Sequence, residues 1–173
     1  GDAKPVSLIE DTAIAVELLP DYIDEFEKML ALYGKDVVYH AHIGTGELHM
    51  RPVLNLKDPA DADLFRTMGL ETARLVKKFK GSMSGEHGDG LVRSEWVGWQ
   101  FGPRLNRAFE EIKDLFDPAG LMNPGKIVRG TKMDDASLFR FPPGYRIQAV
   151  KPALDWSAWN VQNDAATGVL SPS

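Results

Sequence analysis

The side chains best suited to chemistry are the histidines, and all four fall in two short segments. His40, His42 and His49 lie close together, and His87 directly follows Glu86 in a glycine-rich stretch. Glycine lets the backbone approach a bound group closely. Two imidazoles and a carboxylate are a recurrent way to hold a divalent metal with a coordination position left open. His42, His49 and Glu86 are therefore candidate metal ligands, and His87 is a candidate proton acceptor at the open position.

The first three histidines belong to a predicted β-hairpin. Strand-like residues over 37–43 and 48–54 flank the turn Gly44-Thr45-Gly46-Glu47. A short glycine-containing turn between two such runs is typical of a hairpin. The hairpin is the element that must bring the imidazoles together.

The hairpin also predicts which side chains share a face. If it closes on a four-residue turn, His42 faces His49 and His40 faces Arg51. Strand alternation then puts all four side chains on one side of the sheet. Three imidazoles make a poor apolar core unless each has a partner, so this face predicts a binding site.

Two other interpretations of these residues stay open. Two histidines and one carboxylate also suit a flavin-independent, metal-dependent hydrolase or a non-haem iron oxygenase. Alternatively, the chain is a non-catalytic interaction domain in which the histidines only pack. His40 taken alone fits such a structural role.

The remaining pattern predicts an α+β fold, with a small antiparallel sheet and helices packed on one face. Apolar residues at helical spacing predict four helices, and the helix over 103–116 is expected to serve packing alone. Asp58 or Asp61 can cap the second helix. The predicted helices span 20–33, 60–80, 91–101 and 103–116.

The chain divides near residue 130. Helical periodicity is absent from there onward, so we expect a domain over 1–130 and an extended, partly disordered C-terminal arm over 131–173 that wraps around the domain or trails free.

Composition excludes several classes of function. The chain has 173 residues, a formal net charge of -5 and no cysteine. Nucleic acid is not an expected partner, because phosphate binding needs clustered Lys and Arg. An iron–sulfur cluster held by this chain alone is excluded without cysteine. No apolar run approaches the roughly 18 residues of a membrane span, and we expect a cytoplasmic protein.

Three segments together resemble the FAD-linked oxidase C-terminal domain, a family of the vanillyl-alcohol-oxidase superfamily that includes glycolate oxidase, D-lactate dehydrogenase and D-2-hydroxyglutarate dehydrogenase. They are His42-Ile43-Gly44-Thr45-Gly46-Glu47-Leu48-His49, Gly81-Ser82-Met83-Ser84-Gly85-Glu86-His87-Gly88-Asp89-Gly90, and Phe116-Asp117-Pro118 through Asn123-Pro124-Gly125-Lys126-Ile127. Their order and separation also fit that family. The resemblance implies an FAD-dependent enzyme that oxidises a small 2-hydroxy acid.

The resemblance also implies roles for individual positions. In metal-dependent members the positions of His42, His49 and Glu86 bind a divalent metal, usually zinc, and that of His87 acts as the base. The segment with Asn123, Gly125 and Lys126 lies near the flavin in that family. An N-terminal domain there binds most of the FAD, and reduced flavin passes its electrons to an acceptor.

The sequence departs from the family pattern in the hairpin. The usual turn has Asp and Asn where this chain has Thr45 and Glu47, and Arg51 replaces the usual Asn. Arg51, with His40, is therefore a candidate substrate-binding residue, because a guanidinium pairs with a carboxylate through two hydrogen bonds.

The second hairpin strand and the residues after it bear on what else the enzyme needs. The His-Met-Arg-Pro run resembles long members in which an iron–sulfur module follows the flavin part, with 137–145 as a linker. No glycine-rich phosphate-binding turn follows a strand here. We therefore expect this chain alone, a C-terminal fragment, to bind no FAD and to turn over no substrate.

Overall fold

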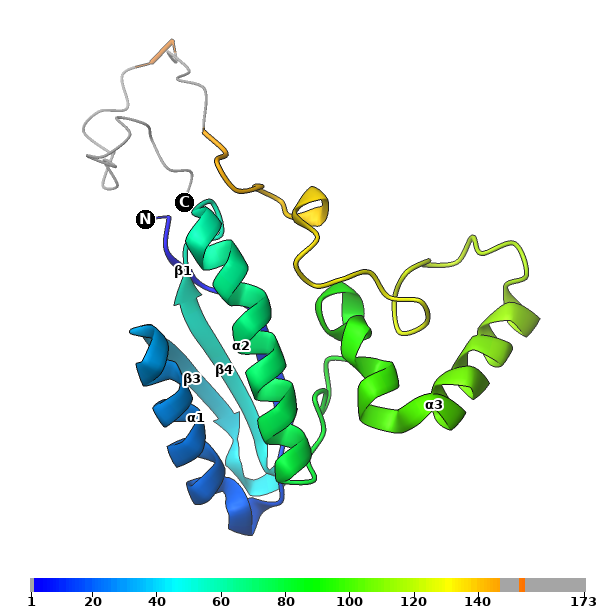
Figure 1. The fold of residues 1–173 in the computed structure, drawn as a ribbon, viewed down its shortest axis with the longest axis horizontal. Coiled ribbons are helices and arrows are strands. Elements are labelled where there is room, and N and C mark those ends of the chain that lie inside the picture. The colour runs from blue at the N-terminus through cyan, green and yellow to red at the C-terminus, as the bar shows by residue number, and fades with distance from the viewer. Residues whose placement is uncertain (1, 147–152, 155–173) are drawn as a thin grey trace.

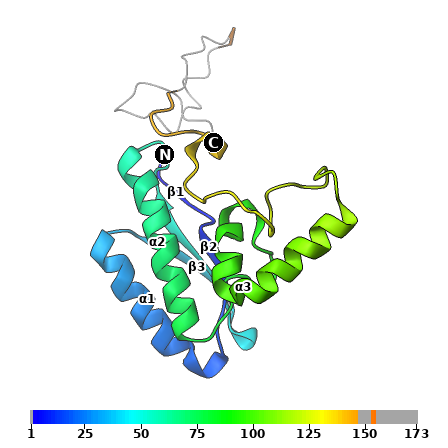
Figure 2. The same ribbon diagram turned by 45° about the vertical axis from the view of Figure 1, so that its right-hand side comes forward.

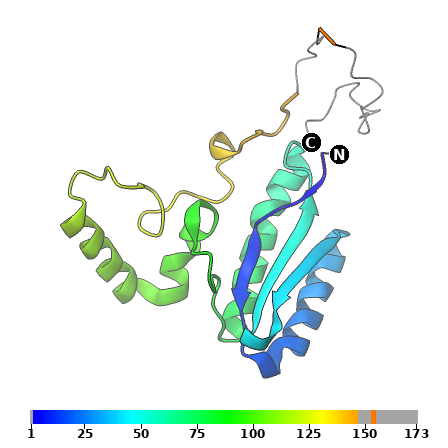
Figure 3. The same cartoon turned by 180° about the vertical axis from the view of Figure 1, so that it is seen from behind.

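The computed structural model describes residues 2–146 and 153–154 and contains a small antiparallel sheet. Its central strand is β4 (Glu47–Leu54), which pairs with β3 (Val37–His42) along one edge. Along the other edge it pairs with β1 (Lys4–Pro5) and β2 (Ile9–Ala13). Figure 3 shows β4 between its neighbours. The predicted α+β class is confirmed.

The predicted hairpin forms, but its predicted register is wrong by two residues. His40, not His42, lies opposite His49, and His42 lies opposite Glu47. The connection is a 3-10 turn, Ile43–Thr45, followed by Gly46 in the left-handed region with φ 77°, so the hairpin closes on residues 43–46. Because side chains alternate with period two, a shift of two residues keeps each on its predicted face.

Two helices cover one face of the sheet, as predicted (Figures 1 and 2). Helix α1 (Leu19–Tyr33) ends at Gly34, which adopts φ 59°. Helix α2 (Pro59–Lys78) begins at Asp58, whose side chain accepts a hydrogen bond from the amide of Ala60. Of the two predicted caps, Asp58 is therefore the one used. Buried side chains between these helices and the sheet include Tyr22, Phe26, Leu48, Met50, Leu54, Met68 and Val76.

The third helix, α3 (Gly90–Phe116), is interrupted at Gly102, whose φ of 82° and ψ of 169° are not helical. The two predicted helices 91–101 and 103–116 are therefore the two halves of α3. The prediction that the second half only packs is wrong within the described residues. Leu115 and Phe116 are 75% and 74% exposed, and Leu105 and Ile112 are exposed as well.

The described part of the predicted arm lies against the domain instead of trailing away. Met133 is only 4% exposed and belongs to the main core, and the ring of Phe139 packs edge-on against Phe65. Glu95 on α3 accepts the amide of Met133 and pairs with Arg66 on α2. The boundary near residue 130 stays a prediction, and residues 147–152 and 155–173 of the arm lie outside the described residues.

Candidate metal centre

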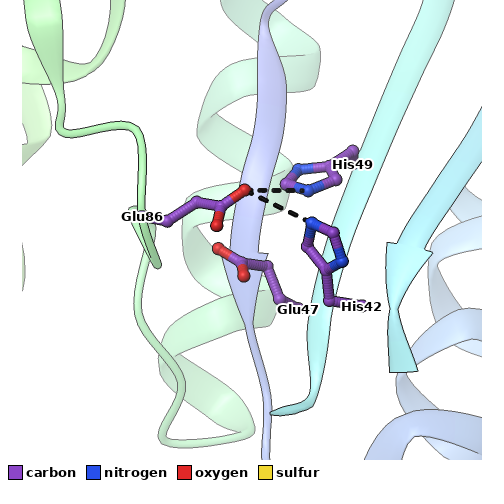
Figure 4. A group of neighbouring side chains, drawn as sticks. All are labelled: His42, Glu47, His49 and Glu86. Carbon is purple, nitrogen blue, oxygen red and sulfur yellow. Dashed lines mark ion pairs between the residues drawn. The ribbon is translucent and has the colours of Figure 1, made fainter. Parts of the chain in front are cut away.

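The face of the sheet opposite α1 and α2 carries His42 and His49, and the loop before α3 brings Glu86 against them (Figure 4). The Oε1 atom of Glu86 lies 3.5 Å from His42 Nε2 and 3.4 Å from His49 Nε2. Zinc bonds of about 2.0–2.1 Å place neighbouring tetrahedral ligand atoms roughly 3.3 Å apart. The separations are long for hydrogen bonds and suit three donors around one ion.

Glu47 joins the same cluster and was not predicted as a ligand. One donor atom from each of His42, Glu47, His49 and Glu86 lies within 4.8 Å of all the others. Glu47 is 8% exposed, and its Oε1 atom has no hydrogen-bond partner. Burial, a hydrogen bond with Asp11 and the charge of Glu86 raise the pKa of Glu47. A buried carboxylate oxygen without a donor is destabilising, and a bound cation would satisfy it.

A sequence signal for Glu47 did exist. It lies two residues before His49, and strand alternation puts both on one face wherever the strand includes Glu47. The sequence predicts a four-residue turn over 44–47, which places Glu47 in the loop instead of on the strand face that carries His49.

The ring of His49 is oriented by the neighbouring strand β2. Its Nδ1 atom lies 2.5 Å from the backbone carbonyl oxygen of Glu10. A proton on Nδ1 donates to that carbonyl and leaves the Nε2 lone pair directed at the cluster. Metal-binding histidines in proteins are almost always oriented by such a second hydrogen bond.

His87 lies at the exposed side of the cluster. Its ring stacks on that of His49 with centroids 4.9 Å apart, and its Nε2 atom is 3.1 Å from Glu86 Oε1. Its Nδ1 atom faces carboxylates of Glu10 and Asp11 at 3.7 and 3.8 Å. This half-exposed imidazole lies where it can take a proton from a molecule bound at the cluster.

Asp11, His49 and His87 form a second group with donor atoms close enough to share an ion. Burial would raise the pKa of Asp11, but hydrogen bonds from Ser84 and from the amides of Glu86 and His87 lower it below the ordinary value. Both carboxylate oxygens of Asp11 already accept these bonds. Asp11 is therefore better suited to orient the loop than to bind a metal.

The two predicted substrate-binding residues have different surroundings. Arg51 directs Nε and a terminal nitrogen to Oε2 of Glu10, each at 2.7 Å, and is partly exposed. His40 lies opposite His49 and is exposed, but it is not among the clustered donors. Arg51 is held in place by Glu10, whereas His40 contributes no donor atom to the groups found among the described residues.

Comparison with known proteins places this arrangement in a family. Residues 1–127 match the family described as "FAD linked oxidases, C-terminal domain". The chain belongs to this family.

Its curated relatives carry consistent names. A D-2-hydroxyglutarate dehydrogenase of Pseudomonas putida is 42% identical over 127 residues, which cover 73% of this chain and 12% of the relative. One of Escherichia coli K12 is 35% identical over 151 residues, covering 87% and 14%. The glycolate oxidase subunit GlcD of E. coli K12 is 29% identical over 126 residues, covering 73% and 25%. The chain thus spans a small part of each relative's length.

The predicted cofactor-binding segment of this FAD-linked oxidase domain lies apart from the cluster. Asn123, Gly125 and Lys126 follow the distal half of α3 (Figures 1 and 2). Asn123 has a φ of 46° and Gly125 a φ of 74°, and Lys126 donates to the carbonyl of Pro124. The three residues form a turn at the molecular surface, and their role toward the flavin stays a prediction.

Within the described residues, no helix has the length and apolar character needed to cross a membrane.

Proposed function

We propose that this chain is the substrate- and metal-binding part of an FAD-dependent 2-hydroxyacid dehydrogenase. The observation that carries the proposal is the convergence of His42, His49 and Glu86, joined by Glu47, on one face of the sheet. Family membership and relatives named D-2-hydroxyglutarate dehydrogenase and glycolate oxidase subunit support it.

The donor set fits a divalent metal such as zinc. Two imidazole nitrogens and one or two carboxylate oxygens are common zinc ligands, and the unpaired buried oxygen of Glu47 calls for a cation. Zinc held there would supply Lewis acidity that lowers the pKa of a substrate hydroxyl. His42 and Glu86, about half exposed, leave the cluster open on the side of His87.

His87 is the proposed general base. An imidazole has an ordinary pKa near neutrality, which suits proton transfer at physiological pH. The carboxylates of Glu10 and Asp11 lie 3.7 and 3.8 Å from its Nδ1 atom, on the side of the ring away from the Nε2 atom that faces Glu86.

Arg51 is the proposed partner of the substrate carboxylate. A guanidinium has five N–H donors in a fixed plane, and only part of this set is directed at Glu10. The remaining N–H groups can bind a carboxylate, with exposed His40 as a second contact on that face.

FAD supplies the hydride acceptor, and its domain is the proposed partner of this chain. The apolar side chains of distal α3, with Leu115 and Phe116 largely exposed, support a further domain covering that surface. Asn123, Gly125 and Lys126 follow it directly and are the proposed contacts to the flavin. The electron acceptor, a downstream iron–sulfur module, inactivity of this chain alone and a cytoplasmic location all stay predictions.

A metal-dependent hydrolase or oxygenase would share the donor set, but no observation favours it over the flavin-linked family to which the chain belongs.

The test is His42→Ala in the enzyme that includes the FAD-binding domain. His42 is 60% exposed on its side chain, so its loss leaves the core intact. We expect bound zinc, measured by elemental analysis, and turnover of a 2-hydroxy acid with a dye acceptor both to fall at least tenfold. The buried His49→Ala variant should behave likewise. Tyr39→Phe, on the same strand, is the control. Full zinc and turnover in both histidine variants would contradict the proposal.

A further inference from the structure

Strand β2 contains an irregularity directly opposite His49. Ile9 pairs with Met50 and Thr12 pairs with Leu48, so Glu10 and Asp11 together face the single residue His49. Such a β-bulge redirects side chains and is frequent beside active sites. In a regular strand Glu10 and Asp11 would point to opposite faces. Here both carboxylates lie within 4 Å of the same ring nitrogen of His87.

The bulge places the carboxylate of Asp11 beneath the loop that carries Glu86 and His87. Asp11 is fully buried. Its Oδ2 atom accepts the Ser84 hydroxyl at 2.6 Å, the Gly85 amide at 3.0 Å and the His87 amide at 2.9 Å. Its Oδ1 atom accepts the Glu86 amide at 3.1 Å. Three consecutive backbone amides therefore converge on one carboxylate, which fixes the loop conformation.

Arg93 completes this arrangement from the first turn of α3. It is 5% exposed, and its guanidinium donates to the carbonyl of Gly88 at 2.6 Å. The same nitrogen lies 4.0 Å from Asp11 Oδ2. The positive charge offsets the buried negative charge of Asp11, because a buried charge is stable only when paired or hydrogen-bonded. The loop is thus held at both ends by one buried ion pair.

We infer that Asp11 is a positioning residue for the candidate metal centre: its carboxylate holds the 84–87 backbone so that the Glu86 oxygen stays within ligand distance of the two histidines. The inference rests on the proposed metal centre. Asp11 acts through the loop, since its oxygens are already engaged by donors. The strand that oriented His49 through Glu10 therefore also sets the distance of Glu86.

The test variant is Asp11→Asn, which keeps the shape but replaces one acceptor oxygen with an NH₂ group. Either orientation of the amide then directs a donor at a donor of the loop. Asp61→Asn is the matched control, because Asp61 also accepts a backbone amide and pairs with a lysine, far from the cluster. Hydrogen exchange of the 85–87 amides and zinc affinity by chelator competition are measured in parent and both variants.

We expect the 85–87 amides of Asp11→Asn to exchange at least tenfold faster and zinc to bind about 10–100-fold more weakly. Asp61→Asn should leave both unchanged. Unchanged exchange in Asp11→Asn overturns the inference, and so does faster exchange with unchanged zinc affinity.

Two further outcomes are decided by the same design. If the parent binds no zinc, the proposed metal centre fails. Amide exchange then decides whether Asp11 fixes the loop: faster exchange in Asp11→Asn supports that role, and unchanged exchange overturns it. If Asp11→Asn does not fold, Ser84→Ala replaces it, because it removes only the shortest of the four bonds. Ser84→Ala is then expected to speed amide exchange and to weaken zinc binding by smaller factors. If neither quantity changes, the inference is overturned.

Discussion

Gly85 offers a sharp test of the metal centre, because the space a side chain would need there is occupied by a proposed ligand. A Cβ atom added at Gly85 would lie 2.4 Å from Glu47 Oε1 and 3.3 Å from the Cβ atom of Ala13. Ordinary contacts are near 3.5 Å, so the Glu47 oxygen has to move by about 1 Å. We therefore expect Gly85→Ala to act on the position of Glu47.

The magnitudes separate stability from metal affinity. Inserting a methyl group into a packed site costs about 1–3 kcal/mol. Because the obstructing atom ends a flexible side chain, the lower end of that range, about 1 kcal/mol, applies here. A ligand displaced by about 1 Å should weaken zinc binding roughly 10–100-fold, or about 1.4–2.7 kcal/mol. The larger effect should thus fall on zinc.

The assay compares zinc affinity by chelator competition with stability by urea unfolding of the metal-free protein. Gly44→Ala is the control, because a Cβ atom at Gly44, in the hairpin turn that precedes Glu47, meets no atom within 4 Å. Gly44→Ala should bind zinc within about twofold of the parent. If Gly85→Ala also does so while remaining folded, Glu47 is not a ligand and the four-donor centre is wrong.

Two further predictions concern the rest of the chain. Met133→Ala should lower the free energy of unfolding by about 2–5 kcal/mol, because Met133 is buried against Gly69. Met122 is exposed, so the control Met122→Ala should change the free energy of unfolding by less than about 0.5 kcal/mol. Equal effects of the two variants in urea unfolding would show that the arm is not docked. The Lys113 ammonium and the amides of Leu121 and Met122 lower the pKa of Asp117 to about 2 from 3.8, so its contribution to stability is present above pH 3.8 and lost as pH falls through about 2. The melting-temperature difference between parent and Asp117→Asn should therefore shrink on acidification from pH 5 toward 2, and a pH-independent difference would refute the assignment.

Local sequence signals predicted the elements of the fold well because they depend on neighbouring residues. Gly34 ends α1 and Asp58 caps α2 as their residue types indicate. The sequence predicts that the distal half of α3 packs within the domain, but among the described residues its apolar face is exposed. An amphipathic pattern indicates that a helix face is covered and does not indicate which segment covers it.

The candidate site was predicted only in part, for reasons of strand geometry. The meeting of His42, His49 and Glu86 followed from motif spacing and resemblance. The hairpin register depended on the turn at Gly46, whose left-handed backbone moves Glu47 into the strand. The role of Asp11 depended on a β-bulge, which alternation of side chains along a strand cannot reveal.

The donors of the cluster divide into a buried pair and an exposed pair. This division explains how the site can have a fixed ligand geometry and still be accessible to a substrate. Glu47 and His49 are less than 10% exposed and belong to the central strand, whereas the side chains of His42 and Glu86 are 60% and 46% exposed. Packing fixes the buried pair, but it cannot fix Glu86. That task falls to the hydrogen bonds of its loop with Asp11. Asp11→Asn, a change at a residue that is not a proposed ligand, should therefore weaken metal binding as strongly as the loss of an exposed ligand.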